Sequence, residues 1–75
     1  MAKKRTKKAD LVVIGKRIRE IRGDVLQDDF APFLGITQGQ LSKIERGKLA
    51  PGIDLLLRLR DRGGRSVDWI LTGEK

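Results

Sequence analysis

The sequence contains no cysteine, no histidine and no tyrosine, and only two prolines, two phenylalanines and one tryptophan in 75 residues. The first two absences exclude disulfide bonds, thiolate or imidazole metal sites, and catalysis by a cysteine or histidine nucleophile or base. Hydrophobic runs are also short, since LVVI at 11–14 reaches neither a membrane span nor a signal-peptide core. We therefore expect one cytoplasmic domain that depends on apolar packing, with no cofactor, no metal and no membrane partner.

Positive charge is abundant in this sequence. Seventeen lysines and arginines against ten acidic residues give a net charge of +7 and a pI near 10.4. This balance is typical of a polyanion binder, and nucleic acid is the first candidate.

Five of the positive charges lie in MAKKRTKK at the start of the chain. We expect residues 1–9 to be a flexible basic arm and residues 10–75 to form the domain. The arm has two interpretations: a solubility tail or localisation signal, or a segment that follows DNA phosphates. Under the second, the backbone-binding residues of the arm are Lys3, Lys4, Arg5, Lys7 and Lys8.

The stretch 27–47, QDDFAPFLGITQGQLSKIERG, has the spacing of two short helices that cross tightly. Ala31 lies where the helices meet and only a small side chain fits. Gly35 follows four residues later, where the first helix must end, and glycine enters the left-handed conformation without a steric penalty. The pattern predicts a helix-turn-helix.

Thr37 is a good N-cap for the second of these helices, and Leu41 and Ile44 form its inward stripe. The opposite face is then free to contact a partner. It carries Gln38, Gly39, Gln40, Ser42, Lys43 and Arg46.

Three more helices are predicted around this motif, which makes an all-α domain of five helices. Asp10 caps the first, which runs to about Arg22. Another runs from Ile53 to about Arg60, and Ser66 caps a last one over 67–71. Their inward positions are Ile14, Ile18, Ile21, Leu55, Leu56 and Leu59.

The first motif helix contains a proline, Pro32, for which we expect a kink or a short 3₁₀ turn. Phe30, Phe33 and Leu34 on the same helix are expected to supply core volume. Asp28-Asp29 is the only adjacent acid pair, and its expected role is to complement the helix dipole. We therefore predict that the chain is not an enzyme.

With these features in place, the sequence resembles the lambda-repressor and Cro family, also called the xenobiotic-response-element family of helix-turn-helix regulators. The resemblance covers about residues 14–74. It rests on the segment IGKRIREIR, on Gln27 with Ala31 and Gly35, and on TQGQLSKIERGK, Pro51 and SVDWILTGEK. It implies a compact lambda-repressor-like DNA-binding domain whose recognition helix enters the major groove.

The resemblance also implies roles for individual residues. The family's base-contacting positions fall on Gln38, Gly39 and Lys43, of which Gly39 has no side chain, so Gln38 would contact adenine and Lys43 guanine. Gln27 matches a glutamine that binds a phosphate and braces Gln38. The remaining backbone contacts would be Gln40, Ser42, Arg46 and Lys48.

Two further pairs follow from the same resemblance. Arg22 and Glu45 match a structural ion pair between the first helix and the recognition helix. In the last helix, Trp69 and Ile70 are the candidates for a dimer contact, with Trp69 covering either the core edge or a partner subunit. A dimer of this family binds two half-sites about one DNA turn apart.

The leading prediction is a sequence-specific regulator of transcription, a phage or prokaryotic repressor, that binds double-stranded DNA as a homodimer on a palindromic operator. The alternative is an antitoxin or adaptor-type protein-binding module on the same fold, with a protein as its partner. The operator sequence, the regulated genes and repression versus activation are not determined. The sequence also leaves open the oligomeric state and whether the chain is complete or one domain of a longer regulator.

Overall fold

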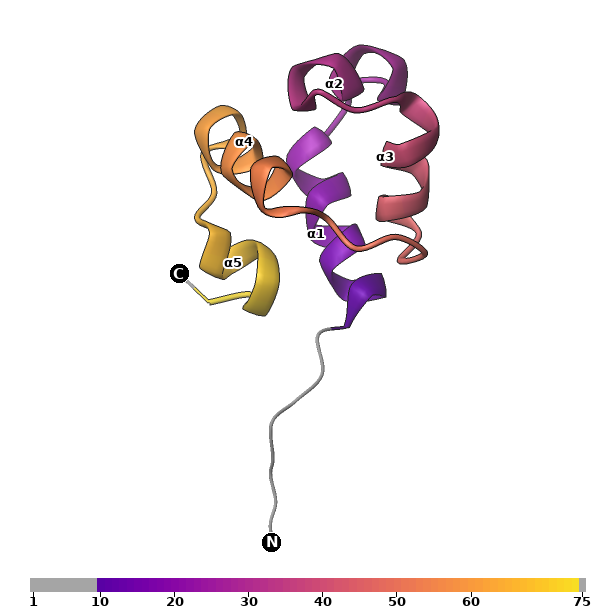
Figure 1. Cartoon of the computed structure of the whole chain (residues 1–75). Helices are drawn as coiled ribbons and strands as arrows, with labels where there is room; N and C mark the ends of the chain where they lie inside the picture. Colours follow the sequence, from indigo (N-terminus) through magenta and orange to yellow (C-terminus); the bar gives the residue numbers. More distant parts are fainter. Residues whose placement is uncertain (1–9, 75) are drawn as a thin grey trace, which may run out of the picture.

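α1, at Leu11–Arg22, begins where the Asp10 carboxylate accepts hydrogen bonds from the backbone N–H groups of Val12 and Val13, at 3.1 and 3.3 Å. The computed structural model describes residues 10–74, which contain no strand. The predicted all-α, five-helix fold is therefore confirmed (Figure 1). After α1 come α2 (Gln27–Leu34), α3 (Gln38–Glu45), α4 (Ile53–Gly63) and α5 (Val67–Thr72).

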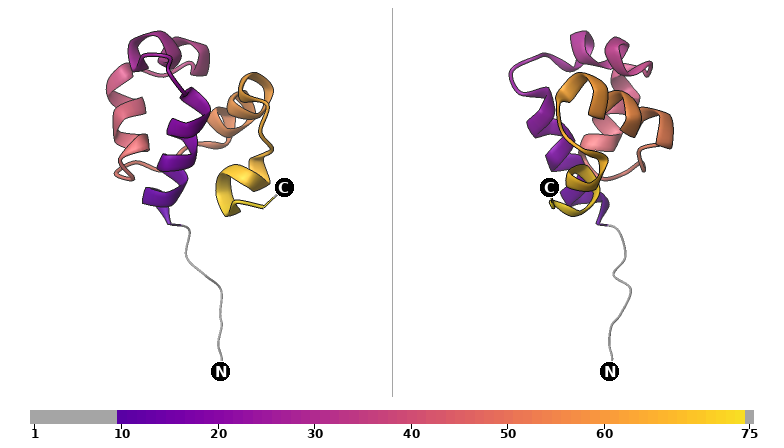
Figure 2. Two further views of the ribbon diagram at one scale, coloured as in Figure 1. Left: turned by 180° about the vertical axis from the view of Figure 1, so that it is seen from behind. Right: turned by 90° about the vertical axis from the view of Figure 1, so that its left-hand side faces the viewer.

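α1 is the helix on which most of the others pack, since it contacts α3, α4 and α5. Seen from behind in Figure 2, α1 lies between α3 on one side and α4 with α5 on the other. Ile14 and Ile18 face the core as predicted, and Ile21 is partly buried against it. The α2 helix packs against α3 and α4, so the helix-turn-helix is held to α1 mainly through α3 and α4.

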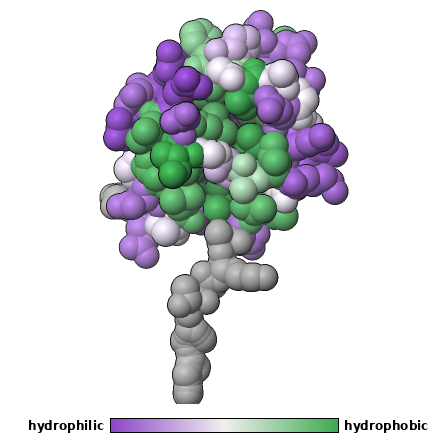
Figure 3. Space-filling view, viewed as in Figure 1, coloured by the Kyte–Doolittle hydropathy of each residue, from purple (hydrophilic) through white to green (hydrophobic). Residues whose placement is uncertain are grey.

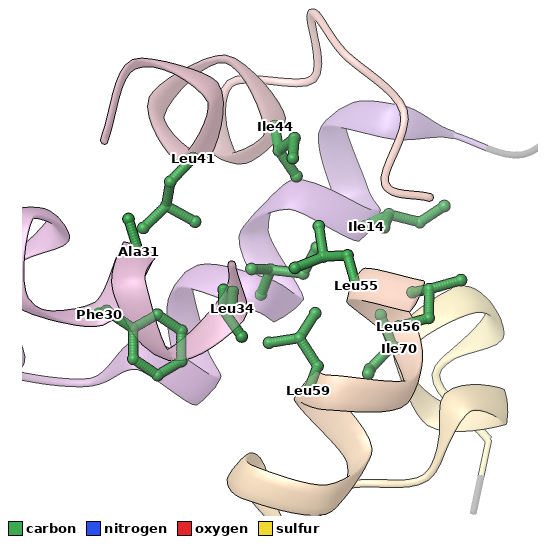
Figure 4. Close-up of a cluster of buried hydrophobic side chains, with 11 residues drawn as sticks. Ile14, Phe30, Ala31, Leu34, Leu41, Ile44, Leu55, Leu56, Leu59 and Ile70 are labelled. Atoms are coloured by element: carbon green, nitrogen blue, oxygen red, sulfur yellow. The ribbon is translucent and has the colours of Figure 1, made fainter. Parts of the chain in front are cut away.

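The turn between α2 and α3 has the predicted geometry. Gly35 ends α2 with φ 72°, in the left-handed region, and Thr37 precedes α3 as its N-cap. Ala31 and Leu41 lie at the crossing and are both buried (Figure 4). Because these side chains meet at close quarters, the two helices are held in a fixed orientation.

The core is one apolar cluster that draws on all five helices, and Figure 4 shows its side chains converging between them. Phe33 is not part of it, contrary to the expectation, because 57% of this residue is exposed. Phe30, Ala31 and Leu34 share the inward face of α2, and Phe33 falls on the other side. The buried members are Ile14, Ile18, Phe30, Ala31, Leu34, Leu41, Ile44, Leu55, Leu56, Leu59 and Ile70.

Two helices differ in detail from the predictions. α2 stays α-helical from Gln27 to Leu34 with Pro32 inside it, so the 3₁₀ turn considered for this position is absent. α4 continues beyond Arg60 to Gly63, and Gly64 ends it with φ 72°. The extension is possible because Gly63 has no side chain where α4 passes Ile21 of α1.

Two arginines cap helix ends in a way that the sequence pattern did not indicate. Arg58 Nη1 donates to the Leu34 carbonyl at 2.9 Å, and Arg17 Nη1 donates to the Ile70 carbonyl at 3.2 Å. Both carbonyls belong to the last turn of a helix, where no backbone partner is available. Arg17 therefore ties α1 to α5.

Residues 10–74 offer neither a membrane-spanning helix nor a metal site. No helix there is long and apolar enough to cross a membrane. In the same range, no group of three or more acidic side chains is arranged to hold a metal ion.

Gly15 marks the closest approach between α1 and α3. A Cβ atom at this position would lie 2.5 Å from the carbonyl oxygens of both Ile44 and Glu45. Because these are backbone atoms, α3 would have to move away from α1 to accept any side chain.

We expect Gly15→Ala to lower the free energy of unfolding by about 1–3 kcal/mol, because the added methyl group overpacks this crossing. The matched control is Gly39→Ala in α3, where the nearest heavy atom to an added Cβ is 3.9 Å away. This second change should not destabilise the protein and should stabilise it by at most about 1 kcal/mol, because alanine has the higher helix propensity. Urea denaturation of both variants measures the two effects, and equal stability of the two variants would contradict the close approach.

Candidate nucleic-acid interface

The N-terminus of α3 is fixed by a reciprocal pair of hydrogen bonds. Thr37 Oγ1 accepts from the Gln40 backbone N–H at 3.1 Å, and Gln40 Oε1 accepts from the Thr37 backbone N–H at 2.9 Å. Such a capping box satisfies two N–H groups that the helix itself cannot. It holds Gln38 and Gly39, the first two residues of α3, in an exposed position.

α3 has a buried side and an exposed side, as its pattern predicts. Leu41, Ile44 and Glu45 are buried. The exposed residues include Gln38, Gly39, Gln40, Lys43, Arg46 and Lys48, and Ser42 is half-buried. The Gln40 side-chain oxygen already accepts the hydrogen bond from the Thr37 backbone N–H. Only its amide N–H groups are therefore available to a partner.

Arg22 and Glu45 form the ion pair implied by the family resemblance. Arg22 Nε donates to Glu45 Oε2 at 2.7 Å and Arg22 Nη2 donates to Glu45 Oε1 at 2.9 Å, a bidentate arrangement. The side chains are 12% and 4% exposed, respectively. The hydrogen bond with Glu45 raises the pKa of Arg22 above its ordinary value, so the pair stays charged on the arginine side.

The same carboxylate also receives a hydrogen bond from the start of α2. Gln27 Nε2 donates to Glu45 Oε1 at 2.9 Å, and Gln38 Nε2 in turn donates to Gln27 Oε1 at 2.6 Å. Gln27 thus braces Gln38, as expected. The contact between Gln27 and Glu45 was not predicted, because it joins residues 18 positions apart and depends on how α2 and α3 cross.

Beside this network lies a hollow of about 270 Å³ with a cationic lining. Arg19 on α1 is part of it and was not among the predicted site residues. The available signal was that Arg19 and Arg22 are three residues apart, which places them on one face of α1. The lining residues are Arg19, Arg22, Gln27, Ser42, Glu45 and Arg46.

The other predicted site residues fall elsewhere. Trp69 is half-buried at the core edge, and the Arg65 guanidinium carbon lies 4.1 Å from its ring centroid. Ile70 is 0% exposed, so its role as a dimer contact is corrected: it belongs to the core and offers no surface to a second copy. The arm residues Lys3, Lys4, Arg5, Lys7 and Lys8 lie outside the described residues.

The family model for the helix-turn-helix domain, HTH_3, matches residues 16–70 of the chain. The chain belongs to this Cro/C1-type helix-turn-helix family. The resemblance of the sequence to this family is thereby confirmed. As a member of this family, the chain is a DNA-binding helix-turn-helix domain and not an enzyme.

Solved structures of other proteins match most of the chain. The P22 c2 repressor protein, solved in complex with synthetic operator 9T, is 28% identical with a TM-score of 0.76, covering 83% of this chain and 97% of that chain. The restriction-modification controller protein C.AhdI from Aeromonas hydrophila is 25% identical with a TM-score of 0.73 and the same coverage. The clp gene regulator ClgR from C. glutamicum is 26% identical with a TM-score of 0.70, covering 85% and 86%. Comparison with curated protein sequences gives no match.

We expect Arg22→Met to lower the free energy of unfolding of this helix-turn-helix domain by about 3–5 kcal/mol, because the buried Glu45 carboxylate loses its cation. The double variant Arg22→Met, Glu45→Leu removes both charges and should recover most of that loss. Arg60→Met is the control, since its ion pair with Asp61 is exposed and its loss should cost less than about 1 kcal/mol. Urea denaturation distinguishes the three, and a double variant as unstable as Arg22→Met would show that the uncompensated charge is not the cause.

Proposed function

We propose that this protein is a sequence-specific regulator of transcription, acting as a repressor, that inserts α3 into the major groove of double-stranded DNA. The observation that supports it most is the braced side chain of Gln38, which stands exposed at the first position of α3 with its amide held by Gln27 at 2.6 Å. A side chain held in one orientation suits bidentate contact with a base edge. Lys43, on the next turn of α3, is the second candidate for base contact.

The surroundings of α3 suit the DNA backbone. The hollow lined by Arg19, Arg22 and Arg46 presents positive charge next to the start of α2. Phosphate contacts of this kind fix the register of a protein on DNA without selecting a sequence. We assign them to Arg19 and to the predicted residues Gln27, Gln40, Ser42, Arg46 and Lys48.

We further propose that the protein binds as a homodimer on an operator with two-fold symmetry. Apolar surface extends across the middle of the face shown in Figure 3, over α4 and α5 in the orientation of Figure 1, with hydrophilic side chains around it. Exposed apolar residues on these helices include Ile53 and Leu57 of α4 and Leu71 of α5, and Trp69 of α5 is half-buried at the core edge. A patch of this kind supports contact with a second copy.

Selection of randomised duplex DNA by the purified protein at physiological salt tests the proposed function. We expect enrichment of a site with two-fold symmetry and half-sites about 10 base pairs apart, as for other dimeric helix-turn-helix proteins. Binding without enrichment of any sequence would leave only electrostatic attraction and would contradict sequence-specific regulation.

Lys43→Ala should relax the preference at one base pair of each half-site, because a lysine on guanine contributes about 1–3 kcal/mol of discrimination there. Repeating the selection with this variant measures the effect. A uniform loss of affinity across all sequences would instead show that Lys43 only contacts phosphate.

Deleting residues 1–8 should weaken DNA binding and flatten its dependence on salt, because fewer counterions are released when fewer phosphates are contacted. We expect the slope of log K against log salt to shrink by about 0.9 for each contact that the arm makes. A titration series from low to physiological salt gives both slopes. If they are the same, the arm takes no part in binding.

A further inference from the structure

Four side chains from three helices form one continuous hydrogen-bonded chain that ends at the exposed face of α3. Arg22 on α1 holds Glu45 at the end of α3 through two hydrogen bonds, of 2.7 and 2.9 Å. Glu45 accepts from Gln27 on α2 at 2.9 Å, and Gln27 accepts from Gln38 at 2.6 Å. These hydrogen bonds therefore connect a buried ion pair to Gln38, the residue proposed to contact a base.

The Glu45 carboxylate sets the direction of the two hydrogen bonds that follow it, from Gln27 and from Gln38. An ionised carboxylate only accepts hydrogen bonds, so Gln27 must turn its Nε2 group toward Glu45. The Oε1 atom of Gln27 then faces Gln38. Because this atom only accepts, Gln38 must donate to it through its own Nε2 group. A glutamine amide has nearly the same shape when its two ends are exchanged, so without Glu45 nothing in this chain would favour one orientation of Gln27.

The orientation of Gln38 decides which base it can recognise. With one N–H given to Gln27, Gln38 has its Oε1 acceptor and its second N–H left for DNA. Adenine offers the matching donor and acceptor, N6 and N7, in the major groove, whereas guanine offers two acceptors, O6 and N7. If the Gln38 amide were turned the other way, its Oε1 would accept from Gln27, and only its N–H groups would face the DNA. Two N–H donors match the two acceptors of guanine.

We infer that Glu45 is a positioning residue for base recognition: through Gln27 it fixes the orientation of the Gln38 amide and so favours adenine over guanine at the base pair that Gln38 contacts. This inference rests on the proposed function. Glu45 can set the orientation because its side chain is 4% exposed and both of its oxygens accept from Arg22, whose Nη1 also donates to the Val25 carbonyl at 2.8 Å.

The test begins by finding the base pair that Gln38 contacts. Selection with the wild-type protein and with Gln38→Ala identifies the base pair whose preference depends on Gln38. If the wild type selects no sequence, the proposed function fails and the inference fails with it. If the wild type selects a sequence but Gln38→Ala changes no position, the inference fails while sequence-specific binding through Lys43 stands. If a position is found, the wild type should prefer adenine there over guanine by about tenfold or more.

The decisive variant is Glu45→Gln, which replaces the two acceptor oxygens of the carboxylate by one acceptor oxygen and one donor NH2 group. Residue 45 then no longer requires a donor from Gln27. We expect the adenine preference at this one base pair to fall to about threefold or less, because the bidentate contact is no longer imposed. Preferences at the other base pairs should remain. A Glu45→Gln protein that folds and keeps the full preference overturns the inference while leaving the proposed function intact.

The matched control is Arg17→Met, which breaks another interhelical arginine contact, to the Ile70 carbonyl at 3.2 Å, without touching the chain to Gln38. It should lower stability and leave the adenine preference unchanged. Equal relaxation in Arg17→Met would show that general loosening of the domain is responsible, which also overturns the inference.

Two further measurements cover the case in which Glu45→Gln does not fold. The double variant Arg22→Met, Glu45→Leu removes the buried charges together and should show the same relaxation. With the wild-type protein, replacing that adenine by purine, which lacks the N6 amino group, should cost about fivefold or more in affinity if the Gln38 oxygen accepts from it. No loss with the purine duplex would overturn the inference, whichever variants fold.

Discussion

The buried ion pair between Arg22 and Glu45 is the interaction on which the DNA-binding face of this protein depends. It joins α1 to the C-terminal end of α3, where both side chains are almost out of contact with water. Such a pair contributes little net stability compared with apolar residues of the same volume, but removing one partner is costly. Its value lies in geometry, because two parallel hydrogen bonds fix the direction of both side chains. Gln27 adds a third contact to the same carboxylate and so attaches α2 to the other two helices.

The rest of the fold keeps this geometry in place with small residues and helix caps. Gly15 lets α1 approach the backbone of α3 at Ile44 and Glu45, and Gly35 turns the chain between α2 and α3. At the far ends of the helices, Arg58 caps α2 and Arg17 caps α5. Each of these contacts joins two helices. Only one side of α3 is packed, but the contacts among the other helices fix the position of α3 and therefore of its exposed face. A recognition helix of eight residues would not be stable without such support.

The parts of the fold that local patterns determine could be predicted from the sequence. Thr37, Gly35 and the spacing of the apolar residues indicate where helices begin, end and face, and the Arg22–Glu45 pair followed from the family resemblance. Contacts that depend on how helices cross could not be predicted, including the hydrogen bond from Gln27 to Glu45 and the Arg17 and Arg58 caps. The exposure of Phe33 and the burial of Ile70 also depend on packing, since a short helix offers too few turns for its pattern to separate the two faces.

Substitution of purine N7 atoms tests whether α3 recognises bases in the major groove. In the operator obtained by selection, each adenine and guanine would be replaced singly by its 7-deaza analogue, which lacks the major-groove acceptor but still pairs normally. We predict that affinity falls only at one or two purines in each half-site, and that Gln38→Ala and Lys43→Ala each abolish the effect at one of them. Unchanged affinity at every purine would contradict major-groove recognition by these two side chains.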